Sequence, residues 1–174
     1  MLCICRKHVR ALAVLLLALG GCAGPLQYKQ LTNTAHGLPP AHELSGTAFY
    51  PQQIHHCGPA ALATVLAAAG VSTTPEELSQ LVYLPQREGS LSIELTAAVR
   101  HFGYLSYELQ PRLQDLLTEI ASGHPVLVLQ NLGLSWLPRW HYAVAIGYNL
   151  QEETIILRSG AHRRVLTDIA TFER

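Results

Sequence analysis

The spacing of hydrophobic residues divides the chain into a helical half and a β-rich half. Apolar side chains recur every three or four residues in segments that start at residues 57, 74, 92 and 111, which predicts four helices. From residue 125 onward the apolar positions form short runs, at residues 125–129, 140–148, 154–157 and 163–166, and these predict strands. Helices followed by short strands are typical of an α+β domain with an antiparallel sheet.

Start and stop signals support this division. Thr74 precedes Pro75 and is followed three residues later by Glu77, a pattern typical of a capped helix start. Ser92 is predicted to cap the next helix, and a further helix is predicted to begin at Asp168. Two weaker β-like stretches, residues 47–50 and 104–109, are predicted as short additional strands, and residues 131–139 as a loop.

Residues 1–21 have the features of an export signal. Basic side chains within residues 6–10 precede an apolar stretch, residues 11–19, that is too short to span a bilayer. Small residues then lead to Cys22, which resembles the lipobox of bacterial lipoproteins and implies cleavage before Cys22 and lipid attachment to it. Because Ala23 and not Asp follows, the resemblance implies an outer-membrane anchor facing the periplasm. The alternative is an ordinary signal peptide with a chance cysteine.

We therefore expect three parts: a lipoprotein signal peptide at residues 1–21, a flexible tether at residues 22–46, and one folded domain at residues 47–174. The tether is predicted because these residues show little periodicity and are rich in Gly, Pro, Thr and Asn. The pattern breaks off within the last predicted helix, so continuation of the domain beyond Arg174 stays open.

Charge and composition exclude several classes of function. The formal net charge is zero and only 14% of residues are charged, with no basic run after the leader, so a nucleic-acid partner is not expected. The sequence contains no Gly-rich phosphate loop and no Ser-centred nucleophile elbow, and it predicts no cofactor. Nothing in it predicts an oligomeric state.

Counting the cysteines draws attention to Cys57. Two of the four cysteines lie in the leader and Cys22 is the predicted lipid site, so Cys57 has no disulfide partner in the exported domain. It stands where a loop turns into an apolar helix, followed by Gly58 and Pro59. Free N–H groups at a helix start favour an anion there, as a nucleophilic thiolate requires. The alternative is a small buried residue that starts a core helix.

Among nine histidines, His141 is the best candidate for a partner base. It opens a strongly apolar predicted strand, where a polar residue needs a reason, whereas His55 and His56 adjoin the cysteine too closely to aim a ring at its thiol. A metal site is not expected, because His55, His56 and Cys57 are consecutive and zinc ligands are usually spaced by two or more residues.

These residues resemble a known family. Two blocks of the sequence are similar to the bacteriocin-processing, double-glycine peptidases. The first is Gln52 followed after four residues by Cys57-Gly58-Pro59-Ala60-Ala61-Leu62, and the second is Trp140-His141-Tyr142-Ala143-Val144-Ala145-Ile146-Gly147-Tyr148. The likeness covers about residues 45–166 and is greatest to exported lipoprotein members without a transporter domain. It implies a papain-like cysteine peptidase fold, with the nucleophile on the first helix and the histidine on the sheet.

The resemblance also implies the roles of the site residues. Cys57 would be the nucleophile, His141 the general base, and Gln52 the side-chain donor of the oxyanion hole, with Gln53 as the rival for that role. The family's third residue, an acid or Asn, is missing. Asn149 lies about 26 Å along the strand from His141, and an antiparallel return brings residues near Ser159 beside His141 instead. Ser159 is the predicted orienter, or else a backbone carbonyl serves.

The sequence therefore predicts a lipid-anchored cysteine peptidase of the bacterial cell envelope that acts on peptide or protein substrates through an acyl-enzyme. Two alternatives stay open. One is an amidase or transpeptidase on the same scaffold. The other is a catalytically degenerate fold that only binds peptides, which the missing acid at position 159 favours.

Overall fold

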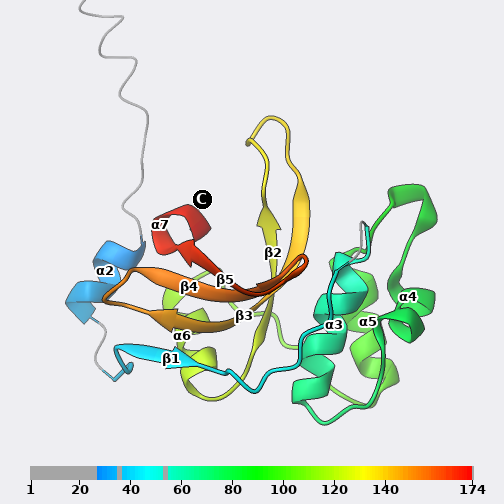
Figure 1. Cartoon of the computed structure of the whole chain (residues 1–174), viewed down its shortest axis with the longest axis horizontal. Coiled ribbons are helices and arrows are strands. Elements are labelled where there is room, and N and C mark those ends of the chain that lie inside the picture. Colours follow the sequence, from blue (N-terminus) through cyan, green and yellow to red (C-terminus); the bar gives the residue numbers. More distant parts are fainter. Residues whose placement is uncertain (1–26, 35–36, 53–54, 174) are drawn as a thin grey trace, which may run out of the picture.

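The computed structural model describes residues 27–34, 37–52 and 55–173. Figure 1 shows three helices, α3 (Cys57–Ala68), α4 (Pro75–Val82) and α5 (Ser92–His101), gathered at one end of the molecule, and a curled antiparallel sheet beside them. This arrangement confirms the predicted α+β class, in which most of the helices precede strands β2 to β5 in the sequence. None of the described helices is long and apolar enough to cross a bilayer.

Strand β3 (Trp140–Asn149) is the centre of the sheet. Along one edge it pairs with β2 (Val126–Asn131) through its first half and with β1 (Ala41–Glu43) through its last three residues. Along the other edge it pairs with β4 (Thr154–Ser159), which pairs in turn with β5 (His162–Asp168). Residues 142–148 of β3 are all buried, because helices cover both faces, and this explains the continuous apolar run in the sequence.

Two separate hydrophobic clusters hold the helices on the sheet. One lies between helices α3, α4 and α5 and one face, and contains Leu62, Leu78 and Val144. The other lies between the opposite face and α2 (Gln27–Thr34), α6 (Leu113–Ala121) and α7 (Ile169–Phe172). The apolar spacing of α4 and α6 predicts which of their side chains enter these clusters, whereas the contribution of α2 comes from Leu31 alone among its buried side chains.

The helix starts follow the sequence signals in two of three cases. Thr74 accepts a hydrogen bond from the backbone N–H of Glu77 (3.2 Å), and the Glu77 carboxylate accepts one from the Thr74 N–H (3.0 Å), forming the predicted capping box. Asp168 caps α7 by accepting from the Thr171 N–H (2.9 Å). Ser92, predicted as a cap, is instead the first helical residue after Leu91.

The predicted tether is wrong where residues 22–46 are described. Helix α2 docks onto the sheet domain, with Leu31 only 5% exposed and the Tyr28 hydroxyl donating to the Leu150 carbonyl (2.8 Å). Strand β1 then joins the sheet through backbone bonds that apolar periodicity does not reveal. The leader, Cys22 and Gln53 lie outside the described residues.

Two short predicted strands are also absent from the described structure. Residues 47–50 run without a regular partner into Gln52, and residues 104–109 form an irregular exposed connection between α5 and α6. The alternation in residues 104–109 mimics a strand, but a strand requires a neighbouring edge to bond with, and the sheet offers none there.

A substitution at Leu31 tests whether α2 is part of the folded domain. Leu31→Ala should lower the free energy of unfolding by about 2–3 kcal/mol, since it removes a buried side chain and leaves a cavity. Chemical denaturation of the mature chain measures this. The control is Leu105→Ala at a 92% exposed leucine, where we expect a change within about 0.5 kcal/mol. Equal, negligible effects at both positions would mean that residues 27–34 behave as a tether.

Candidate active site

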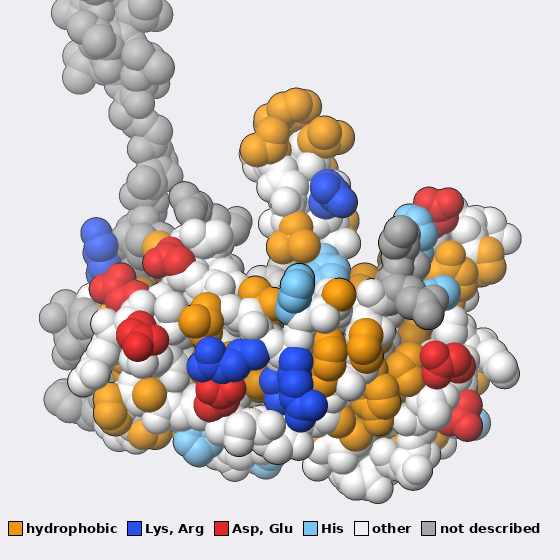
Figure 2. Space-filling model, viewed as in Figure 1, with side chains coloured by type: hydrophobic (Ala, Val, Ile, Leu, Met, Phe, Trp, Pro, Cys, Tyr) orange, Lys and Arg blue, Asp and Glu red, His pale blue; other side chains and the backbone are white. Residues whose placement is uncertain are grey.

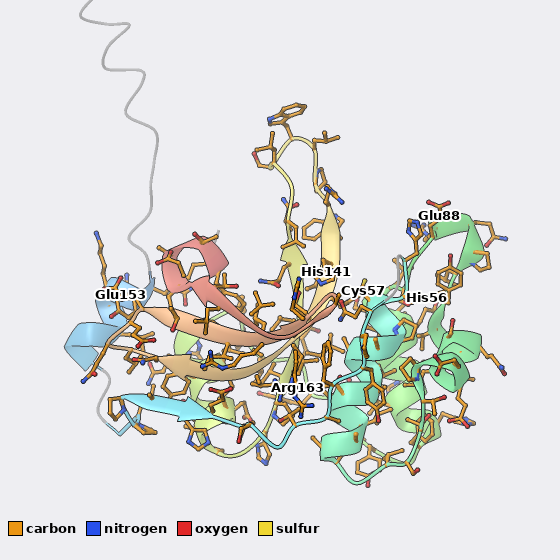
Figure 3. All side chains as sticks on the ribbon, in the orientation of Figure 1. His56, Cys57, Glu88, His141, Glu153 and Arg163 are labelled. Carbon is orange, nitrogen blue, oxygen red and sulfur yellow. The ribbon has the colours of Figure 1, made fainter. Side chains whose placement is uncertain are left out.

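The predicted site residues come from three places that meet at the boundary between the helices and the sheet. Cys57 is the first residue of α3, His141 the second residue of β3, and Ser159 the last residue of β4. Figure 3 shows His141 next to Cys57 in this view, with His56 on the other side of the cysteine. Cys57 packs against the cluster that contains Tyr142, the neighbour of His141, so the helix start lies against the start of β3.

Cys57 occupies a helix start that no side chain caps. The N-cap residue is His56, whose side chain makes no capping hydrogen bond. Pro59 has no N–H group, so Cys57 and Gly58 carry the backbone donors of the first turn. Donors and dipole at this position stabilise negative charge, whether on the thiolate or on an oxyanion beside it. Cys57 is the free cysteine of the described chain and is partly exposed.

Gly58 permits a close approach that no other residue would allow. A Cβ at this position would lie 2.5 Å from Ser90 Oγ and 2.7 Å from Ser90 Cβ, well inside contact distance. Ser90 belongs to the loop between α4 and α5, and its hydroxyl is buried with no hydrogen-bond partner among the described residues. The loop therefore packs directly onto the turn that carries Cys57.

His141 has a defined orientation. Its Nε2 lies 3.0 Å from Ser159 Oγ, so the two residues that sequence reasoning expected to be neighbours are in hydrogen-bond contact. The other ring nitrogen, Nδ1, has no described partner and is the one left to exchange a proton with a thiol. Within the described structure, no hydrogen bond yet joins the ring to Cys57 Sγ. Catalytic bonds are often long in a free enzyme and tighten with substrate.

The environment of His141 favours a neutral imidazole. The ring is partly buried, and burial lowers the pKa of His141 below its usual value. A hydroxyl at position 159 supplies no negative charge to oppose this effect, as a carboxylate would. Nearby, burial raises the pKa of Tyr142, and the charge of Cys57 raises it further. Among the described residues, His141 is thus held in a partly desolvated setting by a hydroxyl rather than a carboxylate.

Gln52 is held between two elements of the site. Its Nε2 donates to the Tyr142 carbonyl (3.1 Å), and its Oε1 accepts from the Gly160 N–H (2.8 Å). The Gln52 backbone N–H also donates to the Gly160 carbonyl (3.0 Å). These bonds tie the segment that leads to Cys57 to the start of β3 and to the β4–β5 turn, so Gln52 has a structural role that the sequence did not indicate.

Arg158 fixes the path of the same segment. Its buried guanidinium donates to the carbonyls of Ser45 (3.1 Å) and Thr47 (2.9 Å) and to the Arg163 carbonyl. Burial lowers the pKa of Arg158, with nearby Arg163 adding to the effect. Ser45 and Thr47 lie more than 100 residues before Arg158 in the sequence, and no local pattern links them to it, so sequence reasoning missed this contact.

Other residues near the site were also missed or lie elsewhere. The loop between α4 and α5 contributes Tyr83, whose ring centre is 4.8 Å from that of His56, and Glu88, whose carboxylate is 4.0 Å from His55. No local motif signals these long-range contacts. Asn149 caps the β3–β4 turn by accepting from the Gln151 N–H (2.9 Å), at the opposite end of β3 from His141. No group of three metal-ligating side chains gathers among the described residues.

Comparison with known sequences and structures places the chain in a family. The sequence model described as the Peptidase_C39 like family matches residues 44–166, from just after β1 into β5. The chain belongs to this family. Among solved structures, a Bacillus anthracis protein named as a C39-like peptidase is similar, with a TM-score of 0.63 and 17% identity over 78% of this chain and 91% of that one. No curated protein matches the sequence.

Membership in the C39-like peptidase family supports a peptidase of the cysteine type, at the level of the family. The match to the solved structure supports the fold, which is the papain-like α+β arrangement expected from the sequence. The matched segment contains Gln52, Cys57, His141 and Ser159, so all the candidate site residues except the predicted lipid site fall inside it.

The contact between Gly58 and Ser90 can be tested by filling it. Gly58→Ala should destabilise the protein by about 1–3 kcal/mol, because the added methyl group has no room. It should also slow alkylation of Cys57 by shifting the turn. The double variant Gly58→Ala/Ser90→Gly removes the clashing atoms and should restore both properties. Gly46→Ala, where nothing lies within 4 Å of the added Cβ, is the control. Tolerance of Gly58→Ala alone would contradict the packing.

The charge at position 159 should set the protonation of His141. Ser159→Asp should raise the pKa of His141, because a carboxylate beside Nε2 stabilises the imidazolium. An imidazolium next to Cys57 favours the thiolate, so alkylation at pH 6 should accelerate roughly tenfold. NMR titration, with His141→Ala to assign the signal, measures the first effect. Ser159→Asn is the uncharged control. An equal His141 pKa in the two variants would contradict the contact between position 159 and the His141 ring.

Proposed function

We propose that this C39-like protein is a cysteine peptidase that cleaves peptide bonds through a thioester on Cys57. The observation that carries the proposal is the placement of Cys57 at an uncapped helix start, against the first residues of the strand that carries His141. A thiol, an imidazole with a free nitrogen and a set of backbone donors are the parts that acyl transfer requires.

In the proposed reaction, His141 Nδ1 takes the thiol proton as Cys57 Sγ bonds to the substrate carbonyl carbon. The resulting oxyanion is stabilised by the Cys57 backbone N–H and by the second N–H of the Gln52 amide. The carbon–nitrogen bond then breaks, and the leaving amine takes its proton from His141. Water attacks the thioester with His141 as base, releasing the acid and regenerating the thiol.

Because burial favours neutral His141, we propose that the free enzyme rests as a thiol and imidazole pair, with the proton moving as substrate binds. In this scheme Ser159 orients the ring without charging it. This differs from sites where a carboxylate holds the histidine cationic, and the expected result is modest activity that increases as the pH rises above the His141 pKa.

The finer assignment rests on sequence resemblance. The double-glycine peptidases suggest cleavage after small residues such as Gly-Gly, and the lipobox-like sequence before Cys22 suggests a lipid anchor at the outer membrane facing the periplasm. A peptide segment or protein at the cell envelope is therefore the proposed substrate.

The proposed activity predicts a covalent intermediate on one residue. Incubated with peptides containing Gly-Gly, the mature protein should yield products cut after the second glycine, and rapid quenching should reveal an acyl adduct by intact mass. Cys57→Ala should abolish both, and His141→Ala should reduce turnover by about 10²–10⁴-fold. His162→Ala, at an exposed histidine on β5, is the matched control and should leave turnover unchanged.

Product analysis separates this proposal from its alternatives. Reaction in ¹⁸O-water should place ¹⁸O in the new carboxyl group if the thioester is hydrolysed, whereas an added amine would be incorporated by a transpeptidase. Ser159 in place of an acid favours the binding-scaffold alternative. That alternative would prevail if Cys57 alkylated slowly, with the same pH dependence in the wild type and in His141→Ala, while peptides bound without cleavage.

A further inference from the structure

The hairpin between β2 and β3 ends in exposed hydrophobic side chains. Residues 132–140 extend well beyond the sheet, and Figures 1 and 2 show the projection with hydrophobic atoms gathered at its tip. Trp136 is 76% exposed, and Leu134 and Leu137 are 57% and 60% exposed. Leu132 and Trp140 are exposed beside them. Clustered exposed apolar side chains on a projecting element mark an interaction site.

The tip is held in a defined shape. Asn131 Oδ1 accepts from the N–H groups of Gly133 (2.9 Å) and Arg139 (2.9 Å), and the Leu132 N–H donates to the Arg139 carbonyl (2.9 Å). Leu134 and Leu137 exchange two backbone bonds of 3.2 and 3.0 Å. A Cβ on Gly133 would lie 2.4 Å from the Leu137 carbonyl oxygen, so glycine is required there. These contacts keep the apolar side chains pointing outward.

The composition of the tip fits the boundary zone of a lipid bilayer. Residues 132–140 contain three leucines, two tryptophans and a proline, one cation, Arg139, and no acidic residue. Tryptophan is enriched where lipid headgroups meet hydrocarbon, leucine contributes apolar burial, and arginine pairs with anionic headgroups. A narrow projection with apolar side chains around its end suits insertion into a fluid layer.

The start of the described chain lies on the same side of the molecule as the tip. In Figure 1 the β2–β3 hairpin points to the top of the view, and α2 lies at the left with its first turn uppermost. Only four residues separate Cys22 from Gln27, a reach of at most about 18 Å. A lipid on Cys22 would therefore hold this side of the protein close to the bilayer, with the hairpin directed at it.

We propose that the β2–β3 hairpin inserts its tip into the bilayer surface and fixes the orientation of the active site against the membrane. The inference rests on the proposed lipid anchor for its geometry. Because His141 follows Trp140 directly in β3, the hairpin stem carries the catalytic histidine. Insertion of the tip would place the site near the membrane surface, where it would meet peptide segments that lie on or emerge from the bilayer.

The chain provides its own probe for this contact. Both of its tryptophans, Trp136 and Trp140, lie in the hairpin, so intrinsic tryptophan emission reports on this element alone. The lipidated mature protein is reconstituted into vesicles of phosphatidylethanolamine and phosphatidylglycerol that contain dibrominated acyl chains. We expect quenching by bromine and a blue shift of the emission. Leu134→Asp/Leu137→Asp should lose both, whereas Leu105→Asp/Tyr107→Asp, at side chains 92% and 81% exposed elsewhere, should retain both.

A second measurement separates the contribution of the hairpin to membrane binding from that of the lipid on Cys22. The chain from residue 23 onward keeps every described residue but cannot be lipidated, and vesicles are added to it directly. The two-aspartate hairpin variant should partition about tenfold more weakly than the unlipidated parent. Binding and quenching in this form would support insertion even if mass analysis found no lipid on Cys22, in which case the anchor proposal alone would fail.

Two results would overturn the inference. The first is a lipidated protein that floats with the vesicles but shows no bromine quenching, which would leave the anchor intact and place the hairpin away from the bilayer. The second is a blue shift that rises with protein concentration in the absence of vesicles and is unchanged by adding them. That result would show that the tip contacts a second copy of the chain.

Discussion

Burial of β3 on both faces is the constraint on which the rest of the structure depends. One face meets the cluster of α3, α4 and α5, and the other meets the cluster of α2, α6 and α7. The buried N–H and C=O groups of the strand can find hydrogen-bond partners only if it pairs along both edges, and it does so with β1, β2 and β4. Its interior is therefore fixed, and the first polar side chain before that interior, His141, emerges at a fixed place beside the start of α3.

The same constraint determines the electrostatic character of the site. His141 stands at the edge of the buried stretch, so its ring is partly withdrawn from water and its pKa is lowered. The neighbouring strand end offers Ser159, which holds the ring through Nε2 but supplies no charge. The buried cation of this region, Arg158, is used to bind backbone carbonyls and not to pair with a catalytic group. Among the described residues, the contact that holds the His141 ring is thus a hydrogen bond to a neutral hydroxyl and not an ion pair.

The sequence predicted those parts of the fold that rest on local patterns. Helices α3, α4 and α6 and the strands from β2 to β5 follow apolar spacing, and the Thr74 capping box was legible as a motif. The antiparallel return of β4 was enough to bring Ser159 near His141. Strand β1 and helix α2 were missed, because three strand residues and one buried leucine in a polar helix produce no periodic signal. Their stability comes from tertiary contacts instead.

The sequence predicted the site residues that stand at the starts or ends of helices and strands, but not those that long-range packing brings to the site. Cys57 and His141 stand at recognisable element starts, but the contacts of Ser90, Tyr83 and Glu88 come from a loop whose placement depends on how α4 and α5 pack. Arg158 was overlooked as well, because it lies in an otherwise apolar strand. Only the three-dimensional path of residues 45–47 explains how the hydrogen-bond donors of this buried cation find acceptors there.

Gln52 illustrates how one side chain can meet both structural and proposed catalytic demands. Its amide accepts one bond, from Gly160, and donates one, to Tyr142, which fixes the plane of the group. An amide nitrogen carries two hydrogens, so one N–H stays available for an oxyanion after these bonds are made. A glutamate could not donate to the Tyr142 carbonyl when ionised, and an asparagine is one methylene shorter. The bonds that hold the segment before Cys57 therefore also orient the proposed donor, so that binding a developing oxyanion requires no further ordering of that side chain.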